Sequence, residues 1–214
     1  MGIFPHPSLL LNHPDPDGLL AVGGQLSPQV LIEAYSKGIF PWPVTEGSES
    51  VLAWFCPPQR AVLEFKELHI PRSLSRQASK KPFTFTFNTD FESVIRACAS
   101  VPRKGQRGTW ITPQMIEAYL ELHRLDRAWS VEARNPEGDL VGGIYGVRSD
   151  QYFSAESMFH HETGASKLAL LELIRILKER GLLMIDIQML TPHLKALGAR
   201  EITRRQFFMK LGLL

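Results

Sequence analysis

The sequence predicts an α+β fold with a mixed sheet, and three features of its second half support this prediction. Two apolar strand patterns at 130–134 and 140–147 flank the turn segment 135–139, which is typical of an antiparallel hairpin. An amphipathic helix pattern covers 166–180, and an apolar strand pattern follows it at 182–190. Antiparallel strands followed by a strand–helix–strand unit are typical of an α+β sheet.

A proline-rich loop at 54–58 divides the 214-residue chain into two unequal parts. We therefore expect a small N-terminal domain over 1–58 and a larger domain over 59–214. The hydrophobic fraction of 44% and the charged fraction of 21% are ordinary for a globular protein, so both parts are expected to have a packed core.

The N-terminal domain begins with residues 1–20, whose prolines, asparagine and aspartates predict extended chain and turns. Ser27-Pro28 is typical of a helix start, with serine as the N-cap and proline in the first helical position. Gly38 is expected to end this helix. The segment 38–43 has two prolines around Trp42, so it predicts a stiff loop that holds the aromatic ring in place.

In the larger domain the other elements follow from alternation, apolar periodicity and capping residues. We expect strands at 61–65, 83–87 and 151–158, and a last strand after Gly198. We expect helices at 72–81, 91–99, 113–125 and 192–197, the third of them capped by Thr112.

Composition excludes several classes of protein. Cys56 and Cys98 are too few for a disulfide scaffold or a four-cysteine zinc site, and they are consistent with a reducing compartment. No apolar run approaches the ~18 residues of a membrane-spanning helix, so we expect no membrane association. The first residues lack the basic and apolar regions of a signal peptide.

Basic charge is concentrated in the middle of the chain. Residues 60–107 carry ten basic and four acidic side chains, whereas residues 1–59 carry one basic and five acidic. Four of the basic residues, called here the basic stripe, would line one face of a helix: Arg72, Arg76, Lys80 and Lys81. The stripe is where we expect a polyanion, although solvated surface charge is the common alternative.

Polar side chains interrupt two apolar strand patterns. Asp186 and Gln188 share one face of a buried strand, and Glu156 shares a face of another strand with Ser154. A buried polar group left without a partner costs ~2–7 kcal/mol, so the aspartate must be satisfied by a ligand, the backbone or an arginine. If the two strands are neighbours, the three groups form an acidic, amide-lined site suited to an amine or another cation.

Other catalytic patterns are absent, including the GxSxG elbow and the HExxH metal motif. His160-His161-Glu162 is the one candidate metal cluster, but adjacent histidines at a strand end usually point apart, so we expect no metal.

The order of elements in the larger domain resembles the fold of the Gcn5-related N-acetyltransferases. The segment 161–166 keeps the glycine of their pyrophosphate-binding loop but lacks its leading arginine or glutamine. A helix N-terminus can still hold an anion, so coenzyme A is a disfavoured but open alternative.

Seven blocks, in order along nearly the whole chain, resemble the leucyl/phenylalanyl-tRNA–protein transferase family. They are Asp17-Gly18-Leu19-Leu20-Ala21-Val22-Gly23-Gly24, Gly38-Ile39-Phe40-Pro41-Trp42, Gly108-Thr109-Trp110-Ile111-Thr112, Val141-Gly142-Gly143-Ile144-Tyr145-Gly146-Val147, Glu156-Ser157-Met158-Phe159, Ala165-Ser166-Lys167 and Ile185-Asp186-Ile187-Gln188. Several blocks are long and unusual, which makes the resemblance specific.

The resemblance implies a bacterial cytoplasmic enzyme with a small N-terminal domain and a Gcn5-like catalytic domain. Such an enzyme moves Leu or Phe, and less readily Met, from aminoacyl-tRNA to proteins that begin with Arg or Lys, which directs them to degradation. The tRNA ester is already activated, so neither a cofactor nor a metal is expected. We also expect a monomer, because the even charge outside the basic segment offers no obvious interface.

The resemblance also implies roles for individual residues. Asp186 and Gln188 would orient the attacking amine and assist its deprotonation, and Glu156 would bind the cationic end of the acceptor or support the pair. Which group takes the proton stays open, since the ribose or a phosphate of the tRNA could serve instead. The aminoacyl-adenosine end would contact Trp42, Trp110, Ile144, Phe153, Met158 and Leu173, and the basic stripe would bind tRNA phosphates. For the apolar residues and tryptophans, plain core packing is the alternative.

Two other classes of function stay open at this point. A coenzyme-A-dependent N-acetyltransferase of the same fold would bind acetyl-CoA and need no tRNA. A non-catalytic tRNA-binding protein would bind tRNA and tolerate the loss of Asp186.

Overall fold

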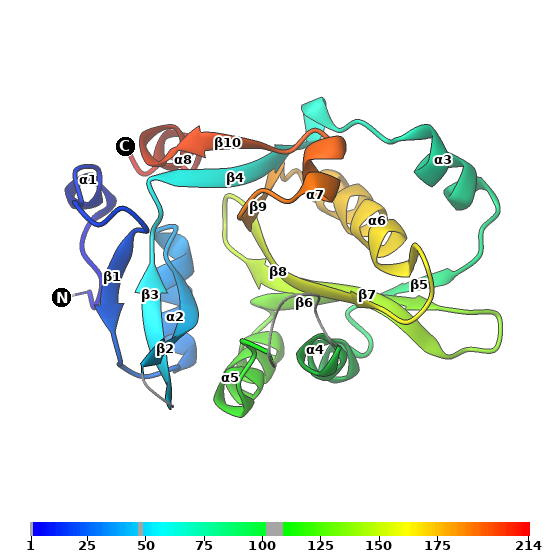
Figure 1. Ribbon diagram of the computed structural model, residues 1–214, viewed down its shortest axis with the longest axis horizontal. Coiled ribbons are helices and arrows are strands. Elements are labelled where there is room, and N and C mark those ends of the chain that lie inside the picture. Colours follow the sequence, from blue (N-terminus) through cyan, green and yellow to red (C-terminus); the bar gives the residue numbers. More distant parts are fainter. Residues whose placement is uncertain (1, 47–48, 102–108) are drawn as a thin grey trace.

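The computed structural model describes residues 2–46, 49–101 and 109–214, which form two sheets that lie side by side (Figure 1). The smaller sheet has the strand order β1-β3-β2 and is antiparallel throughout. Its strands are β1 (Leu19–Val22), β2 (Phe40–Glu46) and β3 (Glu49–Phe55). Two helices accompany it: α1 (Pro7–Leu10) and α2 (Pro28–Ser36).

The larger sheet has the order β10-β4-β9-β8-β7-β6-β5. Only the central pair β8 and β9 is parallel, and all other neighbours are antiparallel, so the sheet is mixed as predicted. Its strands are β4 (Gln59–Glu64), β5 (Thr84–Phe87), β6 (Ala128–Arg134), β7 (Leu140–Arg148), β8 (Phe153–His160), β9 (Met184–Gln188) and β10 (Arg200–Thr203).

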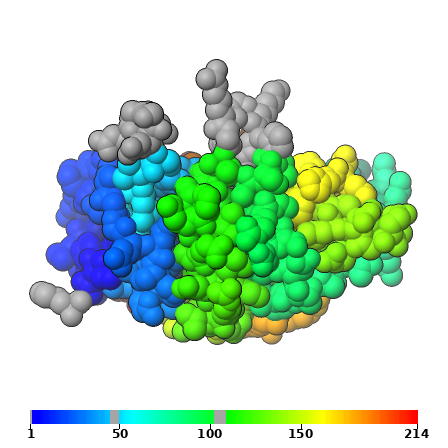
Figure 2. Space-filling model, turned by 90° about the horizontal axis from the view of Figure 1, so that it is seen from below, coloured from blue at the N-terminus to red at the C-terminus, as the bar shows by residue number. Residues whose placement is uncertain are grey.

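Helices cover both faces of the larger sheet. They are α3 (Arg72–Ser79), α4 (Phe91–Ser100), α5 (Pro113–Arg124), α6 (Ala165–Glu179), α7 (Pro192–Ala196) and α8 (Arg204–Lys210), and a 3₁₀ turn, η1 (Phe65–Glu67), follows β4. Helix α6 packs on one face of β6, β7 and β8, whereas α4 packs on the other face of the same strands and α5 lies beside it (Figure 1). In the view from below, the segments of α4 and α5 lie at the centre of the molecule, and the α5 segment borders the N-terminal part (Figure 2).

The two faces have separate cores because strand side chains alternate in direction. On β7, Ile144 joins the core under α6, whereas the next residue, Tyr145, joins the core under α4. The core under α4 continues into the smaller sheet, where Phe40 and Trp54 belong to it. The α+β class with a Gcn5-like order of hairpin, strand, long helix and strand is therefore confirmed.

The predicted helix starts are confirmed by their caps. Ser27 Oγ accepts from the backbone N–H of Val30 at 3.3 Å, and Thr112 Oγ accepts from that of Met115 at 3.2 Å. Both helices begin with proline at the first helical position, where no N–H partner is needed.

The two proline-rich loops expected at 38–43 and 54–58 are wrong in part. Residues from Phe40 onward form β2, and Trp54 and Phe55 end β3, so Trp42 lies on a strand rather than on a loop. Proline is tolerated there because β2 is an edge strand, whose outward N–H groups have no ladder partner.

Three further differences concern helices. Helix α3 ends at Ser79, so Lys81 lies beyond it in a left-handed backbone conformation (φ 48°). Helices α1 and α8 were not expected. For α8 a signal exists, since Thr203 and Gln206 form a capping box, a pattern that marks a helix start.

Candidate active site at the junction of the two sheets

A pocket of about 320 Å³ lies where the smaller sheet meets the ends of β8 and β9. Its apolar lining includes Trp42, Trp110, Ile144, Met158, Leu170 and Ile187. Its polar lining includes Glu156 and Gln188. The pocket thus brings together six of the residues that the sequence proposed for a site, and they come from five segments of the chain: β2, the residues before α5, β7, β8 and β9.

Two tryptophans form one wall of the pocket. The rings of Trp42 on β2 and Trp110 before α5 stack with centroids 4.6 Å apart and planes 16° apart. Both side chains are half-buried, so part of each remains accessible. A flat aromatic surface of this kind suits another planar ring, such as a nucleobase.

The parallel strands β8 and β9 supply the polar side chains of the pocket, in contrast to the aromatic wall. Ser154 lies beside Asp186 in the register, so the two strands run in phase and Glu156 comes to the level of Gln188. Ser154 Oγ lies 3.0 Å from Glu156 Oε1 and 2.7 Å from the Gln188 side-chain amide. The expected convergence of Glu156, Asp186 and Gln188 is therefore present in the structure.

Asp186 is fully buried and forms an ion pair with Arg60, a buried residue of β4. Arg60 Nε donates to Asp186 Oδ1 at 2.8 Å, and Arg60 Nη2 donates to Oδ2 at 2.6 Å. Asp186 does not line the pocket. Its carboxylate therefore reaches the pocket only through the neighbours to which it is hydrogen-bonded.

Gln188 ends β9 in a left-handed backbone conformation (φ 54°). Its backbone N–H donates to Asp186 Oδ1 at 3.0 Å. Its side-chain amide is satisfied when the nitrogen donates to the carbonyls of Ile187 (3.1 Å) and Ala155 (3.0 Å), with the oxygen toward Ser154. A non-glycine residue in this conformation is unfavourable by ~1–2 kcal/mol, and such residues cluster at functional sites.

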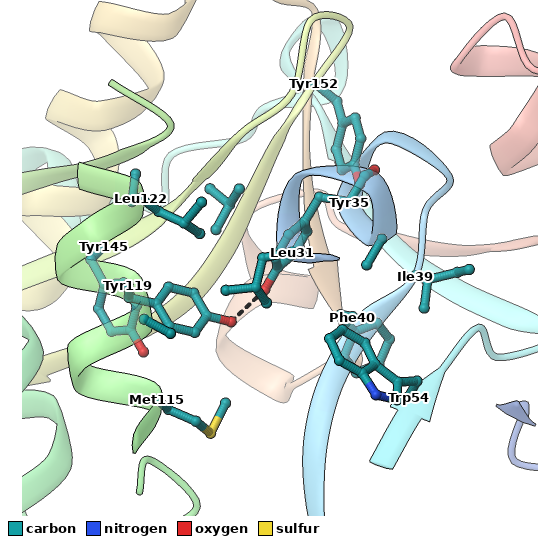
Figure 3. Close-up of a cluster of buried hydrophobic side chains, with 14 of the residues drawn as sticks. Leu31, Tyr35, Ile39, Phe40, Trp54, Met115, Tyr119, Leu122, Tyr145 and Tyr152 are labelled. Atoms are coloured by element: carbon teal, nitrogen blue, oxygen red, sulfur yellow. Dashed lines mark hydrogen bonds between the residues drawn. The ribbon is translucent and has the colours of Figure 1, made fainter. Parts of the chain in front are cut away.

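Glu156 is the carboxyl group of the pocket, and it rests on two buried tyrosines. Tyr119 of α5 donates its hydroxyl hydrogen bond to Glu156 Oε2 at 3.3 Å, and the hydroxyls of Tyr119 and Tyr35 are 2.5 Å apart (Figure 3). Desolvation raises the pKa of Glu156 to about 7, and the nearby carboxylate of Asp186 adds to this shift. Near neutral pH, Glu156 can therefore either accept or release a proton.

Two residues proposed for the pocket lie elsewhere. Phe153 is fully buried in the core under α6 and stacks on Trp129, with ring centroids 6.3 Å apart. Leu173 of α6 is fully buried in the same core. Neither lines the pocket, and both belong to the core between α6 and the sheet.

The basic stripe lies on and just after α3, away from the smaller sheet (Figure 1). Arg72 and Arg76 are exposed on the side of α3 opposite the buried Leu74, and Lys80 and Lys81 are exposed beyond its last residue, Ser79. None of the four forms an ion pair with another residue of the described segments. The stripe is therefore available to an anionic partner.

Several residues that line the pocket or support its polar groups from behind were not anticipated from sequence. Tyr119, Tyr35 and Leu170 read as ordinary helix core, and nothing in their spacing distinguishes them. Arg60 had a signal: an arginine opens an apolar strand, and the aspartate of another apolar strand needs a partner.

The structure also bears on metal and coenzyme sites. Among the described residues, no group of three or more His, Cys, Asp or Glu side chains is placed to hold a metal ion. The loop before α6, where a pyrophosphate would sit in an acetyl-CoA-dependent enzyme, is covered by Gln77 of α3. Gln77 Nε2 donates to Thr163 O at 2.6 Å, and a Cβ added at Gly164 would meet the Gln77 amide at 2.0 Å.

No helix of segments 2–46, 49–101 and 109–214 is long and apolar enough to cross a membrane.

Comparison with known proteins finds matches over nearly the whole chain. Residues 62–212 match the family leucyl/phenylalanyl-tRNA protein transferase, and residues 24–58 match the N-terminal domain of the same family. Similar proteins named leucyl/phenylalanyl-tRNA–protein transferase include those of Maridesulfovibrio salexigens and Syntrophobacter fumaroxidans. The first is 48% identical over 205 residues, 96% of this chain and 82% of the relative. The second is 49% identical over 210 residues, 98% of this chain and 86% of the relative.

Among solved structures, FemX superposes with a TM-score of 0.53 at 10% sequence identity, over 85% of this chain and 70% of FemX. At this identity the likeness concerns the fold alone. The sequence matches over both parts of the chain establish the family. The chain belongs to the leucyl/phenylalanyl-tRNA protein transferase family, which is a family of aminoacyltransferases.

Proposed function

We propose that the protein transfers Leu or Phe, and less readily Met, from aminoacyl-tRNA to the α-amino group of proteins that begin with Arg or Lys. The modified protein would then be directed to degradation. One observation carries the proposal: a single pocket combines an aromatic wall, an apolar lining and the carboxyl–amide pair Glu156 and Gln188. Family membership supports the aminoacyl-tRNA donor.

The reaction is the aminolysis of an ester. The acceptor amine attacks the carbonyl carbon of the aminoacyl ester, a C–N bond forms, and the C–O bond to the terminal ribose of the tRNA breaks. One proton leaves the amine and one reaches the ribose oxygen. The ester supplies the free energy, so the protein has to orient the amine, accept its proton and exclude water.

Glu156 fits the role of proton acceptor in this reaction. An α-amino group has a pKa of about 7.7–8.0, and the pKa of Glu156 is about 7. Proton transfer between groups so closely matched is nearly thermoneutral, which is the condition for efficient general-base catalysis. Glu156 would also attract the cationic acceptor when it is ionised.

Gln188 and Asp186 have different roles in this proposal. Gln188 lines the pocket and orients the amine, whereas Asp186 holds the Gln188 turn from behind. Asp186 is thus a positioning residue. Contact with the amine, which the sequence suggested for it, is disfavoured because both carboxylate oxygens are engaged by Arg60 in the buried core.

The other parts of the aminoacyl-tRNA would bind where the polarity and charge of the protein match them. The aminoacyl side chain would enter among Ile144, Met158 and Leu170, where an apolar lining disfavours charged side chains by their desolvation cost. A difference of a methylene group changes binding by only ~1–3 kcal/mol, so some transfer of Met is expected. The terminal adenine would stack on the tryptophan wall, and the basic stripe would bind phosphates.

A direct assay tests the proposal. Purified protein is mixed with radiolabelled Leu-tRNA and one of two peptides that differ only in an N-terminal Arg or Ala. Label on the Arg peptide and none on the Ala peptide is expected. Label on both peptides would overturn the acceptor specificity, and label on neither, while the ester remains intact, would overturn the transfer itself.

A further inference from the structure

Two buried arginines join the smaller sheet to the rest of the molecule in different ways. Arg60 binds the carboxylate of Asp186, and its guanidinium lies between the rings of Phe40 (4.5 Å) and Phe207 (4.9 Å). Arg204 donates instead to backbone carbonyls, those of Cys56 at 2.5 Å, Pro57 at 3.3 Å and Leu10. Only Arg60 is connected to the pocket.

We propose that Arg60 is a positioning residue for aminoacyl transfer, because its ion pair with Asp186 fixes the Gln188 turn and the Ser154 hydroxyl that shape the polar side of the pocket. The inference rests on the proposed function. It adds a residue that neither lines the pocket nor contacts a substrate.

The hydrogen bonds around Asp186 carry the argument. A carboxylate has about four acceptor positions. Arg60 occupies one on each oxygen, and the remaining position on Oδ1 accepts from the backbone N–H of Gln188 at 3.0 Å. On Oδ2 the remaining neighbour is Ser154 Oγ at 3.4 Å. The guanidinium fork therefore sets the plane of the carboxylate and, through it, both neighbours.

These two neighbours are the polar supports of the pocket. The backbone of Gln188 is left-handed, a conformation that a non-glycine residue keeps only when its surroundings hold it. Ser154 lies between Asp186, Glu156 and the Gln188 amide, so its rotation would change the contacts of both pocket residues. A rotated carboxylate of Asp186 would thus misplace Gln188 and Glu156 together.

Charge and geometry both require an arginine here. The guanidinium balances the charge of Asp186, which would otherwise be a buried anion close to Glu156. A lysine keeps the charge but cannot donate to both carboxylate oxygens in one plane. The flat guanidinium of Arg60 also fits the space between the rings of Phe40 and Phe207, which an ammonium group does not fill in the same way.

The plain alternative is that Arg60 only stabilises the packing of the smaller sheet and α8 on β4. Arg204 is the matched control, since it is also buried and joins the same parts of the molecule, but it touches no carboxylate of the site. The test compares Arg60→Lys with Arg204→Lys in the assay with Leu-tRNA and the Arg peptide.

For Arg60→Lys we expect kcat to fall by about tenfold to a hundredfold per folded enzyme, with KM for aminoacyl-tRNA within about twofold of wild type. For Arg204→Lys we expect a lower melting temperature and an unchanged kcat. Equal effects of the two substitutions on kcat would overturn the proposal, because packing alone would then account for both.

A double-mutant cycle tests the path through Asp186. If Arg60 acts through this carboxylate, Arg60→Lys combined with Asp186→Asn loses no more kcat than the more damaging single substitution. Losses that multiply would overturn the proposal. If Arg60→Lys does not fold, Asp186→Asn alone tests the same path, since the proposal then requires a fall in kcat without a change in KM.

A crystal structure of Arg60→Lys tests the inference without any activity. We expect Gln188 to leave the left-handed region or the Ser154 hydroxyl to turn away from Glu156. Wild-type geometry at both residues would overturn the inference. If the wild-type protein transfers no label at all, the proposed function fails, and this structural result still decides whether Arg60 fixes the geometry of Gln188 and Ser154.

Discussion

The pocket at the sheet junction and the basic stripe of α3 present polar groups in opposite ways. In and behind the pocket, the polar groups are buried or half-buried and each has several partners: Asp186, behind the pocket, is held by Arg60, and Glu156, in its lining, by Ser154 and Tyr119. On α3, the charges are exposed and form no ion pair with the described residues. One region depends on fixed geometry, and the other depends on charge alone.

The difference separates the two tasks of the protein. Groups in a desolvated site act strongly over short distances, so a change there should lower the rate of the chemical step. Exposed charges act over about a Debye length and are screened by salt, so a change there should weaken binding and leave the chemistry intact. The following predictions would sharpen or break this separation.

The largest effect is expected from Glu156→Gln, which keeps the shape of the side chain but removes the proton acceptor. We expect kcat to fall by about 10²- to 10⁴-fold. The wild-type rate should rise with pH through about 7, as Glu156 ionises, whereas in the variant the remaining rise should follow the acceptor amine, at about 7.7–8.0. Steady-state rates from pH 5.5 to 8.5 measure both effects.

Glu201→Gln is the control for this experiment, because Glu201 is exposed on β10 and lies outside the pocket. It should behave as wild type. A full rate in Glu156→Gln would show that another group, such as the tRNA itself, takes the proton.

The next effect concerns the tryptophan wall. Trp42→Leu removes one of the stacked rings, and a stacked base contributes ~1–3 kcal/mol, so KM for aminoacyl-tRNA should rise by about fivefold to a hundredfold. Trp54→Phe is the matched control on the same sheet, since its ring is buried and its N–H donates to Gly23 O. The control should lower the melting temperature without raising KM, and a rise of KM in both variants would contradict the assignment.

A smaller effect is expected from the basic stripe. Arg72→Gln and Arg76→Gln should each lower kcat/KM several-fold at low salt and reduce the slope of log affinity against log salt by about 1. The value of kcat should stay the same. Arg124→Gln, which removes an exposed arginine at the end of α5, is the control. A fall in kcat, or an unchanged salt slope, would break the separation between the two regions.

The smallest effect concerns folding stability. The pKa of Glu156 is raised in the folded protein from an ordinary 4.5 to about 7, so its contribution to stability is fully present below 4.5 and is lost as the pH rises through 7. Glu156→Gln cannot ionise and avoids this loss. Melting temperatures should therefore shift in favour of the variant between pH 5 and 8, whereas a constant difference would contradict the raised pKa.

Local signals predicted much of the fold. Ser27, Thr112 and their following prolines placed two helix starts correctly, because a cap depends only on a few adjacent residues. Alternation along β8 and β9 also predicted that Glu156 and Gln188 would face the same way. Pro41 and Pro43 led to the wrong prediction of a loop at 38–43. Proline is excluded from a central strand but not from an edge strand, and edge position is a property of the whole sheet.

The sequence by itself determined the α+β class, the family, the carboxyl–amide pair on two strands and the concentration of basic charge around α3. These depend on periodicity and residue type within short segments. Tertiary structure alone decided that Asp186 is paired with Arg60, that Trp42 and Trp110 stack, and that Phe153 and Leu173 belong to the core. Each of these depends on which surfaces of distant segments meet, and side-chain burial and partners are set only when the two sheets and their helices pack together.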